Sequence, residues 1–256
     1  MVSNLTPNHC LITGGPRGIG RATALLAARS GYDISIVGIT KASEHAKSLA
    51  DEVVALGRRA VILQGDMSNE EDISLVFDQA VKSLGPLTGL VNAAGVGYTS
   101  RVSEFDGSEL TRLMAVNVIG LMLCCREATL RMSTAKGGQG GAIVNISSMA
   151  ATIGGRPLAS AYAASKGAVD VFSTGFAREV ASQGIRVNVV RPGVISTDMT
   201  AKIVGNPELL AKVEASIPMG RVGTADEIAN SVVSVSYTHL RAHETGRNLV
   251  CRLLLE

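Results

Sequence analysis

Tyr162 and Lys166 are separated by three residues, a spacing that places both side chains on one face of a helix. A phenol can donate the proton that a carbonyl oxygen needs when its carbon is reduced. The pKa of a free tyrosine is ~10 and must fall for proton exchange near neutrality, and a nearby ammonium favours that fall. The same spacing also occurs in ordinary amphipathic helices, so this pair indicates catalysis only if other polar residues accompany it.

Two other polar positions accompany the pair. Ser147 and Ser148 end an expected strand, at the carboxyl edge where open α/β sheets bind ligands. Asn117 interrupts an apolar helical stretch, and a buried amide requires hydrogen-bond partners. The amide either accommodates a bend in the helix or holds a water that links Lys166 to solvent.

A glycine-rich turn follows the first expected strand and precedes an alanine-rich helix. Its glycines are spaced G-x-x-x-G-x-G, a variant of the dinucleotide fingerprint in which backbone N–H groups and a helix N-terminus face a pyrophosphate. Glycines also serve ordinary turns, but this position between strand and helix favours a phosphate cradle. The candidate cofactor-binding residues here are Gly14, Arg17, Gly18, Ile19 and Gly20.

Two more strand ends fit a dinucleotide. Asp66 and Met67 follow the third strand, where Asp66 is expected to accept a hydrogen bond from an adenine amino group. Asn92, Ala93 and Gly95 follow the fourth strand, where small residues leave room for a ribose. The alternatives are a helix cap near Ser68 for Asp66 and a turn for Asn92.

The end of the second strand indicates the cofactor. An acidic residue there would bind a ribose 2′-hydroxyl and favour NAD, but residues 38–41 contain none and Asp33 opens the strand at the wrong end. Arg17 and Lys41 are instead expected to face a 2′-phosphate, for which a guanidinium is well suited. NADP is therefore favoured, with NAD as the alternative.

Short β-branched runs alternate with longer amphipathic runs, which predicts an α/β fold with one parallel sheet covered by helices on both faces. The expected strands are 10–13, 34–37, 60–63, 89–91, 142–146 and 186–190. The expected helices are 19–30, 42–56, 70–84, 108–132, 160–182 and 225–235. We expect a single domain over 1–235, in which a segment at about 198–223 closes over a small-molecule substrate.

Composition excludes several classes of function. The net charge is +2 and the charges are spread along the chain, so the sequence shows no basic patch of the kind that binds nucleic acid or an anionic membrane. The most apolar run, around 115–125, is too short to span a bilayer. The four cysteines form no metal-binding spacing, and Cys124 and Cys125 suit buried free thiols in a reducing compartment. We therefore expect a cytoplasmic protein without a metal.

Residues 236–256 neither continue the alternation nor end it with a strand and turn. This tail resembles a non-native segment and carries no functional argument. His239 and His243 have helical spacing, but no third ligand accompanies them.

The motifs TGxxxGIG, NAAG, VN, ISS, YxxxK and RPG, in this order over about residues 8–235, resemble the short-chain dehydrogenase/reductase family. The stretches GGQGGAIVNISSMAA and VRPGVISTDM look most similar to its glucose-1-dehydrogenase-like or 3-oxoacyl-reductase-like members. The resemblance implies a Rossmann-type fold with seven parallel strands and a homotetramer packed through the helices that carry Asn117 and Tyr162. It implies a catalytic tetrad of Asn117, Ser148, Tyr162 and Lys166. It also implies that the nicotinamide end of the cofactor is held by Pro192, Gly193, Ile195 and Thr197.

The chain departs from the family pattern twice. Ala93 replaces the second asparagine of the usual NNAG, and the tail stands where the family has its closing edge strand. The expected function is an NAD(P)-dependent oxidoreductase acting on a small carbonyl or alcohol, of sugar, ketone or 3-oxoacyl type. The alternatives are a catalytically silent NADP-binding redox sensor and a truncated, inactive enzyme.

Overall fold

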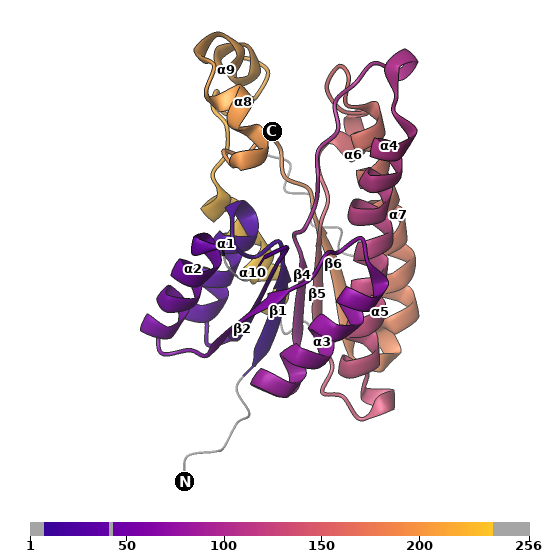
Figure 1. The fold of residues 1–256 in the computed structure, drawn as a ribbon. Helices are drawn as coiled ribbons and strands as arrows, with labels where there is room; N and C mark the ends of the chain where they lie inside the picture. The colour runs from indigo at the N-terminus through magenta and orange to yellow at the C-terminus, as the bar shows by residue number, and fades with distance from the viewer. Residues whose placement is uncertain (1–7, 41–42, 238–256) are drawn as a thin grey trace.

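The computed structural model describes residues 8–40 and 43–237, and within them six strands form one sheet (Figure 1). All neighbouring strands are parallel, in the order β3-β2-β1-β4-β5-β6. The strands are β1 (His9–Thr13), β2 (Asp33–Gly38), β3 (Ala60–Gln64), β4 (Gly89–Asn92), β5 (Gly141–Ile146) and β6 (Ile185–Val190). The predicted doubly wound sheet is confirmed. Its order reverses between β1 and β4, the place where such sheets open a crevice for ligands.

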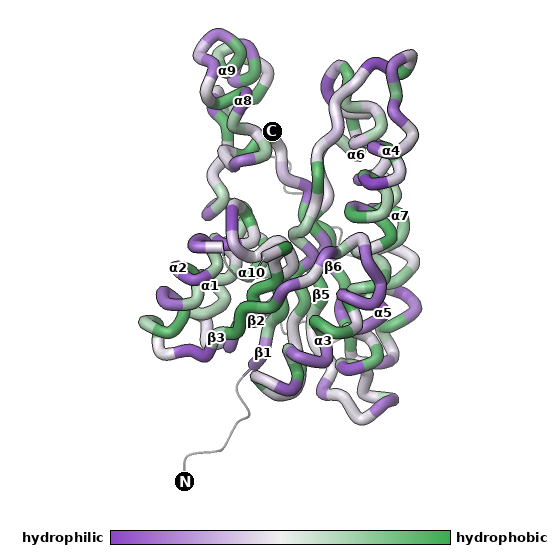
Figure 2. The backbone as a smooth tube through the Cα atoms, in the orientation of Figure 1, coloured by the Kyte–Doolittle hydropathy of each residue, from purple (hydrophilic) through white to green (hydrophobic). Residues whose placement is uncertain are grey.

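Helices cover both faces of the sheet, and the strands between them are strongly hydrophobic (Figure 2). One face packs against α3 (Glu70–Leu84), α5 (Leu121–Met132) and α7 (Ser160–Val180). The other packs against α1 (Gly18–Arg29), α2 (Glu44–Ala55) and α10 (Ala225–Tyr237). Leu11 faces the first layer and Ile12 the second, as the period of two in a strand requires.

The expected helix over 108–132 is not uniform. It comprises α4 (Gly107–Met114), a π-helical turn η2 (Ala115–Gly120) and α5. By length and mean hydropathy alone, Gly107–Met132 could cross a membrane, so the apolar run is longer than the sequence suggested. Half of its most apolar window is buried in the protein, and the thiols of Cys124 and Cys125 lie in the core as free cysteines. A core helix accounts for this composition.

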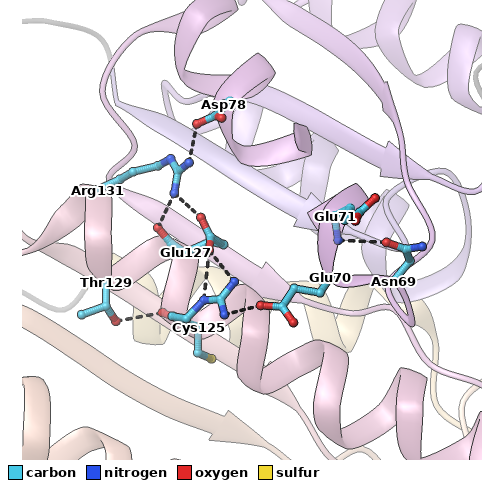
Figure 3. A network of polar contacts seen from close by, with 9 residues as sticks. Asn69, Glu70, Glu71, Asp78, Cys125, Glu127, Thr129 and Arg131 are labelled. Carbon is cyan, nitrogen blue, oxygen red and sulfur yellow. Dashed lines mark hydrogen bonds and ion pairs between the residues drawn. The ribbon is translucent and has the colours of Figure 1, made fainter. Parts of the chain in front are cut away.

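A network of charged side chains joins α5 to α3 (Figure 3). Glu127 is buried and accepts hydrogen bonds from Arg126 and Arg131. The two arginines reach in turn to Glu70 and Asp78 on α3. Because the buried carboxylate has two guanidinium partners, its desolvation is compensated and the two helices are held in register.

Four short helical pieces lie where the sequence suggested loops. They are α6 (Ala150–Ile153), η5 (Asp198–Thr200), α8 (Ala201–Val204) and α9 (Pro207–Glu214). The last three lie in the segment 198–223, called the lid here because the sequence predicts that it closes over a substrate. A parallel bridge closes its base, since Ser196 N donates to Gly223 O and Gly223 N donates to Val194 O, both at 2.9 Å. The lid is thus one closed loop standing on the rim of the sheet.

Strand β6 is the edge of the sheet on its side, among the residues described. Arg186 on this strand donates to the carbonyls of Val235 and Ser236 at 2.8 and 2.6 Å, which fixes the end of α10. The family resemblance implies a seventh strand, whereas residues 8–237 contribute six. The predicted atypical tail from 238 onward, with its two histidines, and Lys41 lie outside the described residues.

Candidate active site

A cavity of about 1110 Å³ opens at the carboxyl edge of the sheet. Its wall combines the glycine-rich turn, the segments after β4, β5 and β6, the first turns of α7 and the lid. Fourteen of the predicted site residues line it: Gly14, Arg17, Gly18, Ile19, Gly20, Ala93, Gly95, Ser148, Tyr162, Lys166, Pro192, Gly193, Ile195 and Thr197. Positions up to 183 residues apart in the chain therefore meet in one space.

The glycine-rich turn leaves no room for side chains. Gly14 has φ +66°, and a Cβ added to it would lie 2.8 Å from the backbone nitrogen of Ala94. A Cβ on Gly20 would collide with the carbonyl oxygen of Gly14. Helix α1 begins at Gly18 with neither a side-chain cap nor an acidic residue in its first turn. Its first N–H groups are thus available to an anion, which fits the phosphates of a dinucleotide.

Arg17 borders this turn and is mostly exposed. Its guanidinium pairs with Asp198 of the lid at 3.1 Å. On the neighbouring strand, β2 ends at Gly38, and Ile39 beyond it is 72% exposed. No acidic side chain follows β2 within the described residues up to 40, so Arg17 remains the charged group nearest the turn in sequence.

Tyr162 lies in the first turn of α7 and lines the cavity together with Ser148, whose side chain acts on the phenol. Ser148 also accepts from the backbone nitrogen of Ala150 at 3.1 Å, which orients its hydroxyl. Burial raises the pKa of Tyr162, and the side chain of Ser148 opposes this only in part. The expectation of a lowered pKa is therefore wrong for the protein alone. The physical reason is desolvation of the phenolate by burial, which outweighs the effect of Ser148.

Lys166 is 5% exposed, and its Nζ lies 5.8 Å from the centre of the Tyr162 ring. The ammonium donates to the carbonyl oxygen of Ile146, the last residue of β5, at 2.9 Å. Burial lowers the pKa of Lys166 to about 8, while the charge of Asp170 one turn further along α7 raises it. The lysine thus belongs to the same cavity as the phenol without direct contact with its hydroxyl.

Asn117 lies in the π-helical turn and is buried behind the cavity wall. Its Oδ1 accepts from Val96 N at 2.8 Å, and its Nδ2 donates to Val96 O at 2.9 Å and to Ser165 Oγ at 3.1 Å. A Cβ on Gly95 would lie 3.3 Å from Asn117 Oδ1 and 3.6 Å from Lys166 Nζ. The amide therefore fixes the segment after β4 beside the lysine. The position of Asn117 in a π-helical turn agrees with the alternative in which the amide accommodates a bend in the helix. That Asn117 holds a water linking Lys166 to solvent stays a prediction.

Three predicted cofactor-binding residues do not line the cavity. Asp66 is exposed, and its Oδ1 accepts from Ser68 N and Oγ at 2.9 and 2.8 Å, whereas the helix cap that was the alternative is provided by Asn69. Met67 is packed in the core against Cys124. Asn92 is 2% exposed, and its Nδ2 donates to Asn145 Oδ1 at 2.8 Å beneath the sheet edge. Their motif locates the strand ends correctly, but these side chains turn away from the cavity.

A partly buried ion pair at the cavity was not predicted from the sequence. Arg191 Nε lies 2.6 Å from Asp170 Oδ2, with the two side chains 12% and 13% exposed. Arg191 directly follows β6 and lines the cavity, whereas Asp170 is the carboxylate that acts on Lys166. The pair ties the segment before Pro192 to α7. Only the spacing of four residues between Lys166 and Asp170 could have signalled it.

Comparison with known proteins gives a consistent result. The family model for short chain dehydrogenases matches residues 8–208. The uncharacterized oxidoreductase YgfF of Escherichia coli (strain K12) is 44% identical over 224 residues, which cover 87% of this chain and 90% of that protein. The 3-oxoacyl-[acyl-carrier-protein] reductase of Mus musculus is 40% identical, with 88% and 89% covered.

A solved structure agrees in fold. A short chain dehydrogenase from Burkholderia cenocepacia J2315, in complex with NADP, superimposes with a TM-score of 0.81 at 31% identity. The match covers 90% of both chains. The arrangement of helices and strands is therefore shared with this protein over nearly the whole described chain.

Proposed function

Since the chain belongs to the short-chain dehydrogenase/reductase family, and is thus an NAD(P)-dependent oxidoreductase, we propose that it interconverts a carbonyl and an alcohol with Tyr162 as acid and base. The observation that carries the proposal is that Tyr162, Ser148 and Lys166 line the same cavity as the glycine-rich turn. A proton donor and a phosphate cradle in one enclosed space fit hydride transfer to a polarised carbonyl.

NADP is the proposed cofactor. The N-terminus of α1 and the glycines would hold its pyrophosphate, and Arg17 its 2′-phosphate in place of Asp198. The segment from Pro192 to Thr197, which packs against Gly18, would hold the nicotinamide. The absence of an acid after β2 within the described residues supports NADP over NAD. The solved relative in complex with NADP supports the same choice.

When bound, a reduced nicotinamide would supply the hydride for the carbonyl carbon. Ser148 orients the carbonyl oxygen by hydrogen bonding, and Tyr162 donates its proton to that oxygen. The raised pKa of Tyr162 keeps the phenol protonated at neutral pH, as a proton donor must be. Lys166, held by Ile146, adds positive charge to the cavity and stabilises the phenolate that remains.

Cellular setting and assembly are proposed by analogy. We expect a cytoplasmic enzyme that forms a homo-oligomer through α5 and α7, as the family resemblance implies. The exposed apolar side chains of Ile119 and Val171, on η2 and α7, fit such an interface. Relatives named 3-oxoacyl reductases suggest a 3-oxoacyl compound among the substrates to test.

The test is Tyr162→Phe, assayed for NADPH oxidation against ketones, β-ketoacyl thioesters and aldoses. Turnover should fall at least ~10²-fold while NADPH affinity, measured by fluorescence titration, is retained. Tyr98→Phe is the matched control, because Tyr98 lines the same cavity but its hydroxyl accepts from Asp106 N. Equal turnover in wild type and Tyr162→Phe would refute the mechanism. NADPH binding without any turnover in the wild type would favour the silent sensor, and no stabilisation by NADPH would favour an inactive enzyme.

A further inference from the structure

The charges that line the cavity are almost all paired. Its cationic side chains are Arg17, Arg156, Lys166, Arg191 and Arg221. Arg17 pairs with Asp198, Arg191 with Asp170 and Arg221 with Glu227, while Lys166 donates to Ile146 O. Only the side chain of Arg156 has no hydrogen-bond or ion-pair partner among the cationic side chains of this cavity within the described residues.

Arg156 belongs to the tight loop that joins α6 to α7, six residues before Tyr162. Within this loop Gly154, Gly155 and Leu158 have φ of 76°, 83° and 71°. Leu158 is the only non-glycine residue with positive φ in the described chain, a conformation that costs about 1 kcal/mol or more. Its carbonyl accepts from Ser100 N at 2.9 Å, which anchors the loop to the segment after β4. The backbone is therefore held in a strained shape that displays residue 156 at the cavity.

The position of Arg156 assigns it to the substrate rather than to the cofactor. The loop lies beside α4 and the top of α7, across from the lid helices α8 and α9 (Figure 1). The glycine-rich turn and Arg17, the groups that fit phosphates of a dinucleotide, belong to β1 and α1 on the other side of the sheet's crevice.

Apolar side chains provide much of the cavity wall that the lid and the loop enclose. Met199, Ile203, Ile217 and Met219 contribute from the lid, and Ile153 from α6. An ion pair formed beside such a wall is screened less than one in water. A lone guanidinium there is a strong binding group for an anion, and a carboxylate or phosphate matches its fork of donors.

We propose that Arg156 binds an anionic group of the substrate, so that this enzyme takes carbonyl compounds carrying a carboxylate or phosphate beside an apolar segment. This inference rests on the proposed function, because it assigns the other end of the same substrate. The carbonyl lies at Tyr162, and the anion lies toward the loop that precedes it.

The test compares matched pairs of compounds in wild type, Arg156→Gln and Arg156→Lys. Acetoacetate against acetoacetamide probes a carboxylate, and dihydroxyacetone phosphate against dihydroxyacetone probes a phosphate. Wild type should prefer one charged member by kcat/KM. Arg156→Gln should lower kcat/KM for that member by about 10- to 100-fold and leave its neutral partner unchanged, the size of a lost charge-assisted hydrogen bond. Arg156→Lys should restore part of the loss.

Arg112→Gln is the control, because Arg112 is an exposed α4 arginine outside the cavity wall. A direct readout is the rise in melting temperature of the NADP-loaded enzyme with 3-hydroxybutyrate, with its amide and with glycerol 3-phosphate. If Arg156→Gln changes charged and neutral compounds alike, or wild type prefers neither anion, the assignment of Arg156 is wrong while the oxidoreductase function stands. If no carbonyl is reduced, the proposed function fails, and the melting shifts alone decide whether Arg156 binds an anion.

Discussion

Replacing Lys166 by methionine should abolish turnover and yet stabilise the protein at pH 7. The side chain is 5% exposed, and burial lowers its pKa from 10.5 to about 8. That fall corresponds to about 3 kcal/mol spent on burying the charged form. Methionine fills a similar volume without charge, so the substitution removes the cost of burying the ammonium. Loss of the hydrogen bond to Ile146 O offsets about 1 kcal/mol of this gain in stability. The net expectation is about 2 kcal/mol of added stability.

Urea unfolding of both proteins from pH 7 to 10.5 measures this. The pKa of Lys166 is lower in the folded than in the unfolded chain, so between about 8 and 10.5 the unfolded chain keeps a proton that the folded chain has released. Wild-type stability gains from this as the pH rises, and the advantage of Lys166→Met should shrink and vanish before pH 10.5. Buried cysteines titrate identically in both proteins and cancel in the difference. A difference that is independent of pH, or a variant less stable at pH 7, would refute the reasoning.

Three further substitutions test the site. Arg17→Ala should raise KM for NADPH far more than KM for NADH, because a 2′-phosphate loses its cation; equal effects in steady-state kinetics would contradict the NADP assignment. Asp170→Asn removes a charge that raises the pKa of the active-site lysine, so the alkaline limb of the turnover profile should move to lower pH. The same change leaves Arg191 without its carboxylate partner and should lower the free energy of unfolding in urea by about 3 kcal/mol. If neither the alkaline limb of the profile nor the free energy of unfolding changes, the role assigned to the Asp170–Arg191 pair is wrong. Gly20→Ala drives a Cβ into the carbonyl of Gly14 and should abolish NADPH binding in a fluorescence titration; retained affinity would mean that the turn is not a phosphate cradle.

The alternation of short β-branched runs with longer amphipathic runs was enough to predict all six strands and their parallel arrangement in one sheet. Every expected strand is observed, with ends that differ by two residues or fewer, because β-branched runs bounded by turns leave little choice. The glycine spacing likewise located the tight turn proposed as the phosphate cradle, since Gly14 and Gly20 meet backbone atoms at distances that exclude side chains. Local chemistry fixed these features.

Side-chain directions at the strand ends could not be predicted in the same way. Asn92 is the last residue of β4 and points toward Asn145, whereas Ala93 and Gly95 face the cavity. A motif predicts where the strand ends, but successive side chains of a strand point to opposite faces. An error of one residue in the strand therefore reverses the direction expected for each side chain. Asp66 instead bonds Ser68 two residues away, a local competitor that the sequence offered but could not rank against a ligand.

Long-range contacts and helix distortions also escaped the sequence. The contact between Asp170 and Arg191 depends on how α7 lies against the end of β6, and 21 residues separate the partners. The π-helical turn around Asn117 has the composition of an ordinary helix, so a period of 3.6 conceals it. The lid helices α8 and α9 are four and eight residues long, and Gly205 and Pro207 mark the break between them, a composition that suggests a loop.

Burial acts on Tyr162 and Lys166 in opposite directions. It raises the pKa of the phenol and lowers that of the ammonium to about 8, so the phenol holds its proton more tightly than the lysine does. When two groups of one site are separated in this way, their roles as acid and base separate too. The phenolate that reduction leaves on Tyr162 then takes up a proton from Lys166. Because Nζ lies 5.8 Å from the centre of the ring, a bridging group must carry this proton. Carbonyl reduction should therefore weaken as the pH rises through about 8, where Lys166 loses its proton, whereas alcohol oxidation should strengthen.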